Sequence, residues 1–123
     1  MYEVMVEIHF SASHQIKGYE GNCAKMHGHN WKVRVYVRSN ELDELGLVID
    51  FRILKKMLLE VIAPLDHSLI NEHPDFTDSN PSSENLASWI YKKMKEKLVS
   101  RRCWLHAVEI FESETSGLYY TEE

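Results

Sequence analysis

Residues 27–38 read HGHNWKVRVYVR, and apolar and polar side chains alternate from Trp31 onward. One face of the stretch carries Trp31, Val33, Val35 and Val37, and the other carries Lys32, Arg34, Tyr36 and Arg38. Such alternation is typical of a β-strand that buries one face. Residues 3–10 show the same pattern, with one face formed by Val4, Val6, Ile8 and Phe10. We therefore expect these two segments to form an antiparallel pair of strands.

The residues after the second strand have the period of amphipathic helices. Asp50 can cap a first helix, which Pro64 ends, and its apolar stripe consists of Phe51, Leu54, Leu58, Val61 and Ile62. A polar loop is expected over residues 66–81. Ser82 or a neighbour can then cap a second helix, whose inward side chains are Leu86, Trp89, Ile90, Met94 and Leu98.

The end of the chain returns to the strand pattern over residues 105–113 and 118–121, with a turn expected at Gly117. The predicted order is therefore ββααββ. Two hairpins would form one four-stranded antiparallel sheet, with both helices on a single face. A chain of 123 residues leaves room for one such α+β domain, spanning residues 1–123.

The composition indicates which partners and which cellular compartment to expect. The formal charge of −5 speaks against nucleic acid as a partner, because a nucleic-acid-binding face would be basic. We see no secretory signal, and no apolar run approaches the roughly 20 residues needed to cross a bilayer. The two cysteines, Cys23 and Cys103, are expected to be reduced thiols in the cytoplasm. A disulfide between them is the alternative that the sequence leaves open.

Three histidines are candidate metal ligands. His27 and His29 are two residues apart on a predicted strand, so both imidazoles project from the same face. His14 follows the strand that is expected to pair with theirs, so its imidazole can reach the same place. Three neutral imidazoles with an open fourth position are typical of a catalytic zinc site. The spacing alone is equally compatible with core histidines that bond to the backbone.

Cys23 and Glu112 each have two interpretations. Cys23, four residues before His27, is either a fourth ligand of a structural zinc site or a thiolate base beside an open metal. Glu112 shares a predicted strand face with Ile110. Its carboxylate either enters a pocket, where it can accept two N–H bonds from a heterocycle, or reaches water beyond the strand end. The pairs Asp66-His67 and Ser82-Ser83, taken alone, are ordinary turn and helix-capping sequences.

Several short motifs, in a fixed order along nearly the whole chain, carry a resemblance to a known family. They are Phe10-Ser11-Ala12-Ser13-His14, Cys23-Ala24-Lys25-Met26-His27-Gly28-His29, Val48-Ile49-Asp50-Phe51, Leu65-Asp66-His67-Ser68-Leu69-Ile70-Asn71, Pro81-Ser82-Ser83-Glu84-Asn85 and the strand that leads to Glu112. In this order they resemble the family of 6-pyruvoyltetrahydropterin synthase and 6-carboxytetrahydropterin synthase. Glu112-Ser113 and Ser82-Ser83 depart from the threonine-containing versions usual in that family, but keep the hydroxyl groups.

The resemblance implies a tunnelling fold (T-fold), in which trimers stack into a homohexamer and the active sites lie between subunits. The zinc ligands that it implies are His14, His27 and His29. The implied catalytic residues are Cys23 as the base, Asp66 and His67 of a neighbouring subunit, which tune the base, and Glu112, which anchors the pterin. Ser82 and Ser83 would lie near the pterin ring.

The implied substrate is 7,8-dihydroneopterin triphosphate, with Lys17 and Lys25 as candidates for binding the triphosphate. The compact length favours the 6-carboxy branch, a carbon–carbon lyase reaction that releases acetaldehyde and supplies precursors of 7-deazapurines such as queuosine. One alternative is the 6-pyruvoyl branch, a phosphorus–oxygen lyase. The other is a non-catalytic pterin-binding oligomer in which Cys23 closes the zinc site.

Overall fold

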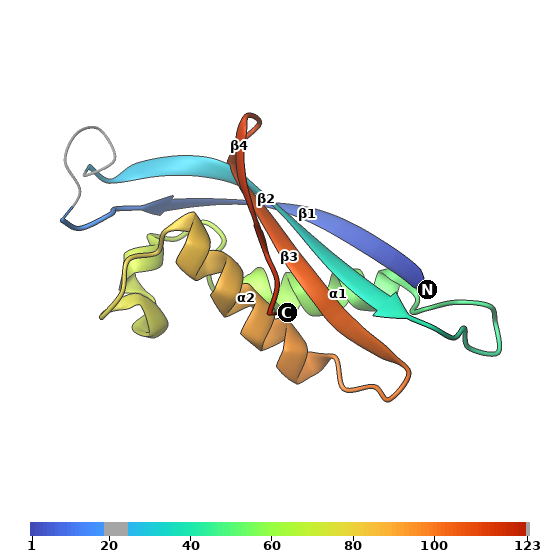
Figure 1. The fold of residues 1–123 in the computed structure, drawn as a ribbon. Coiled ribbons are helices and arrows are strands. Elements are labelled where there is room, and N and C mark those ends of the chain that lie inside the picture. Colours follow the sequence, from blue (N-terminus) through green and yellow to red (C-terminus); the bar gives the residue numbers. More distant parts are fainter. Residues whose placement is uncertain (19–24, 123) are drawn as a thin grey trace.

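Four strands form one antiparallel sheet in the order β1-β2-β3-β4, in a computed structural model that describes residues 1–18 and 25–122. The strands are β1 (Tyr2–His14), β2 (His27–Ser39), β3 (Cys103–Ser113) and β4 (Ser116–Tyr120). Between β2 and β3 lie the helices α1 (Phe51–Ile62) and α2 (Ser83–Lys97) and two short 3₁₀ helices, η2 (Ile70–Glu72) and η3 (Pro74–Phe76). Both α-helices cover the same face of the sheet (Figure 1). The predicted α+β fold and its order ββααββ are confirmed.

The long pair β1–β2 carries most of the buried surface of the sheet. Its register runs without a break from Tyr2 opposite Ser39 to His14 opposite His27. Because side chains alternate between the two faces, the odd-numbered residues of β2 face the helices, and the side chains of Trp31, Val33, Val35 and Val37 are fully buried. Both strands extend beyond the alternating segments that predicted them. The extension places histidines at one end of the sheet.

The opposite face of the sheet carries many charged side chains, and several of them pair across strands. Glu7 lies directly opposite Arg34, and its Oε1 is 2.8 Å from the Arg34 Nε. Arg34 also reaches Glu109 of β3, which accepts a 2.6 Å hydrogen bond from the hydroxyl of Tyr36. Burial and the contact with Glu109 raise the pKa of Tyr36 to about 12. Opposite charges at directly opposed positions favour this register over a shifted one.

Helix α1 begins as predicted but turns one apolar residue outward. Asp50 caps it by accepting a 2.8 Å hydrogen bond from the backbone N–H of Arg52. The residues that pack into the core are Leu54, Leu58, Val61 and Ile62. Phe51, which we expected on the same stripe, is 57% exposed. It is the first helical residue, and its side chain lines an open groove together with Tyr2 and Leu47.

Helix α2 is capped by Ser82, whose hydroxyl accepts a 3.1 Å hydrogen bond from the backbone N–H of Asn85. Its buried residues are Leu86, Ala87, Ile90, Tyr91 and Met94. Trp89 and Leu98, both predicted to point inward, are only partly buried. The indole of Trp89 packs instead against η3, where its N–H donates to Asp75 at 2.8 Å. None of the helices that the structure describes is long and apolar enough to cross a membrane.

The segment after α1 covers part of the outer edge of β1. The backbone N–H of His67 donates to the carbonyl of Ser11 at 2.6 Å, and the N–H of Ser13 donates to the carbonyl of Ser68 at 2.9 Å. Asp66 accepts from the backbone N–H of Ser11 at 3.0 Å. Residues 66–69 therefore cover the outer edge of β1 near His14. Without them, the backbone groups of this edge would be unpaired.

The last hairpin turns before Gly117 and not at it, because β4 already begins at Ser116. Gly117 lies opposite Phe111, and a Cβ placed there would come within 2.4 Å of the Phe111 ring. The glycine is therefore required for space. Cys103, the first residue of β3, is buried and forms no disulfide with a residue that the structure describes. Its alternative disulfide partner, Cys23, lies outside the described residues.

Candidate metal centre and active site

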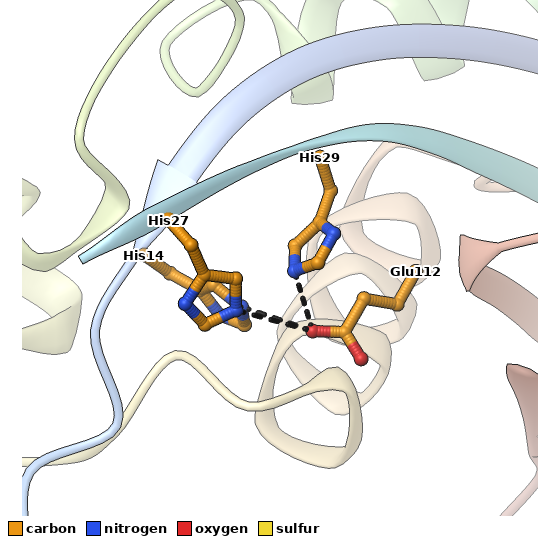
Figure 2. Close-up of side chains that lie close together, drawn as sticks. All are labelled: His14, His27, His29 and Glu112. Carbon is orange, nitrogen blue, oxygen red and sulfur yellow. Dashed lines mark hydrogen bonds and ion pairs between the residues drawn. The ribbon is translucent and has the colours of Figure 1, made fainter. Parts of the chain in front are cut away.

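Three histidines and one glutamate meet at the end of the sheet. His14 is the last residue of β1 and His27 the first of β2, and the two are cross-strand partners. His29 follows on the same face of β2. Glu112 arrives from β3, one residue beyond the last β2–β3 pair. Their side chains point toward one another (Figure 2), and one ligand atom from each lies within 4.8 Å of all the others.

The backbone fixes which nitrogen of two of these imidazoles carries the proton. His14 Nδ1 lies 2.7 Å from the carbonyl oxygen of Pro81, and His27 Nδ1 lies 2.7 Å from that of Lys25. A carbonyl oxygen can only accept, so in each ring Nδ1 is the donor. In the neutral rings, both Nε2 atoms therefore carry a lone pair. Bonds of this kind orient histidine ligands in metal sites.

These lone pairs converge on one point. The Nε2 atoms of His14 and His27 are 3.1 Å apart. Glu112 Oε1 lies 3.1 Å from His14 Nε2 and 2.8 Å from His29 Nε2. Despite that proximity, His29 Nε2 is buried and has no hydrogen-bond partner of suitable geometry among the described residues. Acceptors that face one another in this way repel unless a cation lies between them, so the donor set fits a bound metal ion.

The local environment favours the neutral form of His29. Burial is the main cause that holds the pKa of His29 below its ordinary value of 6.5. The carboxylate of Glu112 opposes this shift, and the imidazoles of His27 and His14 add to it. A neutral imidazole is the form that binds a metal.

Trp31 supports the histidines from the core side. Its side chain is fully buried, and its indole N–H donates to the carbonyl of Ala12 at 3.2 Å. The ring centroids of His14 and His29 lie 5.0 Å and 5.2 Å from that of Trp31, in edge-on contacts. Sequence reasoning treated Trp31 only as a core residue. Its position two residues after His29 on the same strand face is the signal that could have revealed the contact.

Two cavities adjoin the cluster, and Glu112 lines both. The first, of about 340 Å³, extends toward the start of α2 and is lined by His14, Ile16, His27, Ser82, Ser83, Glu84 and Glu112. The second, of about 420 Å³, opens toward the polar face of the sheet and is lined by His9, Gly28, His29, Asn30, Lys32, Phe111, Glu112, Ser113 and Glu114. The structure thus brings Ser82 and Ser83 to the first cavity with Glu112. The hydroxyl of Ser82 is at the same time the cap of α2.

Asp66 and His67 lie away from this cluster in their own chain. They are on the outer edge of β1, where His67 Nδ1 is 3.0 Å from Asp66 Oδ1. The side chain of His67 is 82% exposed, and its backbone has a left-handed φ of 58°. Neither residue lines the two cavities. Cys23 lies outside the described residues, so its part in the site stays a prediction.

The fold and this cluster define a class of protein: an α+β domain in which three histidines and a glutamate, at the end of an antiparallel sheet, could hold a metal ion. Comparison with known proteins identifies the family within this class. A family model described as 6-pyruvoyl tetrahydropterin synthase matches residues 3–123. The chain therefore belongs to the 6-pyruvoyl tetrahydropterin synthase family, whose members include lyases that act on pterins.

Relatives and solved structures agree with this assignment. A 6-carboxy-5,6,7,8-tetrahydropterin synthase from Synechocystis is 38% identical over 125 residues, which covers 98% of this chain and 93% of that protein. A protein of the same name from Bacillus subtilis is 32% identical and covers 96% and 82%. The structure of the 6-pyruvoyl tetrahydropterin synthase of Caenorhabditis elegans superposes with a TM-score of 0.85 at 27% identity, covering 100% and 98%. The predicted T-fold is thereby confirmed.

Proposed function

We propose that this chain, as a single domain over residues 1–123, is a zinc-dependent 6-carboxy-5,6,7,8-tetrahydropterin synthase. It would convert 7,8-dihydroneopterin triphosphate and one water molecule to 6-carboxy-5,6,7,8-tetrahydropterin, acetaldehyde and triphosphate, in the biosynthesis of 7-deazapurines such as queuosine. One observation carries the proposal: three imidazoles converge beside a cavity that also holds a carboxylate and two serines. The names of the relatives from Synechocystis and Bacillus subtilis, 6-carboxy-5,6,7,8-tetrahydropterin synthases, support the 6-carboxy product.

The metal in this proposal is zinc, held by His14, His27 and His29. Three nitrogen ligands and an open position are the usual donor set of a catalytic zinc ion. Bound there, zinc would act as a Lewis acid that polarises the side-chain oxygens of the substrate and acidifies the neighbouring C–H bond. The Nδ1 bonds to Pro81 and Lys25 would hold the ligands in place while the substrate binds and leaves.

Glu112 would recognise the pterin. An ionised carboxylate can accept two N–H bonds from the 2-amino-4-oxo edge of the ring, as it does from a guanidinium group. Its side chain is 32% exposed and faces the first cavity, where Ser82 and Ser83 would line the ring. In the structure the same carboxylate lies among the imidazoles, within reach of the proposed zinc position. A role as a metal ligand is therefore the competing interpretation.

Cys23 would move the proton as the base. Asp66 and His67 would act on the Cys23 of a neighbouring subunit. The exposed side chain of His67, and the fact that neither residue lines the two cavities of its own chain, support an intersubunit role. We also propose that the protein is a homohexamer in the cytoplasm with a pterin triphosphate as its ligand, as its family membership implies.

A second candidate is the 6-pyruvoyl reaction, which eliminates triphosphate but keeps the whole side chain. The superposition on the Caenorhabditis elegans enzyme favours it. The two reactions are separated by incubating the purified, zinc-loaded protein with 7,8-dihydroneopterin triphosphate and identifying products by mass. Acetaldehyde together with the 6-carboxy product supports our proposal. A product that retains all side-chain carbons identifies the 6-pyruvoyl reaction, and absence of turnover with retained pterin binding identifies a non-catalytic oligomer.

A further inference from the structure

The second cavity differs from the first in its charge. Lys32 contributes an ammonium group to it, and Asn30 and Ser113 contribute an amide and a hydroxyl that can donate hydrogen bonds. None of the described residues that line the first cavity is a lysine or an arginine. The carboxylates at the second cavity are Glu112, which also faces the metal cluster, and Glu114 on the exposed hairpin tip. The cavity therefore offers both a cation and neutral donors next to the metal centre.

Among the residues that the structure describes, the ammonium of Lys32 contacts an aromatic ring and forms no ion pair with a carboxylate. The other cations on this sheet face, Arg34 and Arg38, are bound by Glu7 and Glu3. Lys32 Nζ instead lies 4.3 Å from the centroid of the Phe111 ring. A cation–π contact fixes the position of an ammonium group and leaves its N–H bonds available for an anion.

The ring that holds Lys32 is itself fixed by its neighbours. Lys32 lies opposite Phe111 on the β2–β3 pair, and Phe111 lies opposite Gly117 on the β3–β4 pair. The missing side chain of Gly117 leaves the space that the ring occupies, since a Cβ there would lie 2.4 Å from the Phe111 Cδ2. Three adjacent strands thus place one ammonium group at the wall of the second cavity. The contact between Lys32 and Phe111 adds nothing to the packing of the core, because it lies on the sheet face opposite the helices.

From this geometry we propose that Lys32 binds the triphosphate of the substrate; the inference rests on the proposed function. The metal cluster lies between the two cavities, and Glu112 lines both. A substrate whose ring lies in the first cavity and whose side chain meets the metal centre extends its phosphates into the second. Lys17 and Lys25, the candidates suggested by the sequence, line neither cavity, and both side chains are exposed.

Inorganic tripolyphosphate, used as a competitive inhibitor, tests the assignment directly. In Lys32→Gln we expect its inhibition constant and the KM for the substrate to rise by about tenfold or more, because a charge-assisted bond is lost. Binding of unphosphorylated 7,8-dihydroneopterin should stay unchanged. Lys32→Arg should restore most of the tripolyphosphate affinity. Phe111→Leu, which keeps the cation but removes its platform, should give an intermediate loss.

Lys17→Gln and Lys25→Gln are the matched controls, since they remove the same charge from residues outside the cavity. Unchanged tripolyphosphate inhibition in Lys32→Gln, or a loss in a control variant instead, overturns the proposal. An equal loss of affinity for the unphosphorylated pterin does so too, because it indicates a distorted site. The wild-type product assay decides separately whether the proposed function holds. If the proposed function fails, calorimetry still measures the affinity of the wild-type and Lys32→Gln proteins for tripolyphosphate. A difference between them supports the anion site on its own.

Discussion

His14 and His27 are cross-strand partners whose Nε2 atoms face each other across 3.1 Å. Each ring donates its Nδ1 proton to a backbone carbonyl 2.7 Å away. In the neutral rings, two lone pairs therefore face each other, and the buried Nε2 of His29 lies beside them. Within residues 1–18 and 25–122, this relationship is the strongest physical sign of a cation site, because it is costly without a positive charge between the rings.

The metal centre predicts about one zinc ion per chain in the purified protein. His27→Ala or His29→Ala should lose the metal and the activity together, since each removes one of three nitrogen ligands. Metal analysis by mass spectrometry after dialysis, in parallel with the turnover assay, measures both. His73→Ala is the control, because this residue caps η3 and lies outside the cluster. Full zinc occupancy in both ligand variants would contradict the assignment.

Glu112→Gln separates pterin recognition from metal binding. The substitution keeps the shape of the side chain but removes its charge and one acceptor, and bonds to charged groups contribute roughly 1.5–3 kcal/mol. If Glu112 anchors the pterin, calorimetry should show affinity for the ring weakened by about tenfold or more, with the zinc content unchanged. Loss of zinc with the substitution would instead make Glu112 a metal ligand. Unchanged pterin affinity would remove it from the binding site.

Cys23→Ala distinguishes a catalytic base from a fourth zinc ligand. As a base, Cys23 contributes to proton transfer alone, so turnover should fall by about 10²–10⁴-fold while zinc content and melting temperature stay near those of the wild type. As a ligand, its loss would open a closed site, and zinc affinity and stability would fall with activity. We expect the first outcome. Zinc lost from the variant on dialysis would establish the second.

The position of Asp66 and His67 predicts that two inactive variants can complement each other. Cys23→Ala and His67→Ala, coexpressed with different tags and purified as mixed oligomers, should regain activity well above that of either variant alone. Such oligomers contain sites that combine an intact Cys23 with an intact His67 from another subunit. The control mixes Cys23→Ala with His29→Ala, which we expect to share one site in one chain and so to stay inactive. Absence of recovery in the first mixture would place the pair outside the active site.

The cross-strand pair Glu7–Arg34 predicts a pH-dependent contribution to stability. The hydrogen bond from Arg34 is the main cause that holds the pKa of Glu7 below its ordinary value of 4.5. A lowered pKa in the folded state stabilises the protein above about pH 4.5, and this stabilisation is lost as the pH falls through the folded-state pKa. Glu7→Gln should therefore lower the free energy of unfolding by about 0.2–1 kcal/mol at pH 7. The difference from wild type should shrink toward pH 3.

Thermal melts of the wild type and the variant at several pH values measure this effect. Glu44→Gln serves as the control, because Glu44 is exposed on a loop. A difference between wild type and Glu7→Gln that stays constant down to pH 3 would rule out the ion pair as its source.

The strands and the histidine cluster could be predicted because their signals are local. Alternation with a period of two residues both defines β2 and places His27 and His29 on one face. The same parity argument put Glu112 on the face of Ile110 but left a pocket and bulk water open for its carboxylate, which in the structure lies 2.8 Å from His29 Nε2. The helix caps Asp50 and Ser82 were likewise readable from residue type and position.

The remaining features depend on tertiary contacts that no local pattern encodes. The exposure of Phe51 follows from where α1 first touches the sheet, and the partial burial of Trp89 follows from its bond to Asp75. The attachment of residues 66–69 to the edge of β1 joins segments about 55 residues apart, as the Ser11–Asp66 bond shows. Gly117 was taken for a turn residue, whereas its role is to make room for the ring of Phe111.

The carbonyls of Pro81 and Lys25 that hold the imidazoles of His14 and His27 have a consequence for variation and for engineering. Every amino acid supplies a carbonyl, so the residue types at positions 25 and 81 can drift during evolution without changing the ligands' tautomers. At these two positions, what must be kept is the backbone conformation that points the carbonyl at the imidazole. The side chains of Lys25 and Pro81 do not by themselves reveal this role, because only their backbone carbonyls take part. A designer who grafts only the three histidines onto another sheet would lose this support, and must carry over the two loop backbones as well.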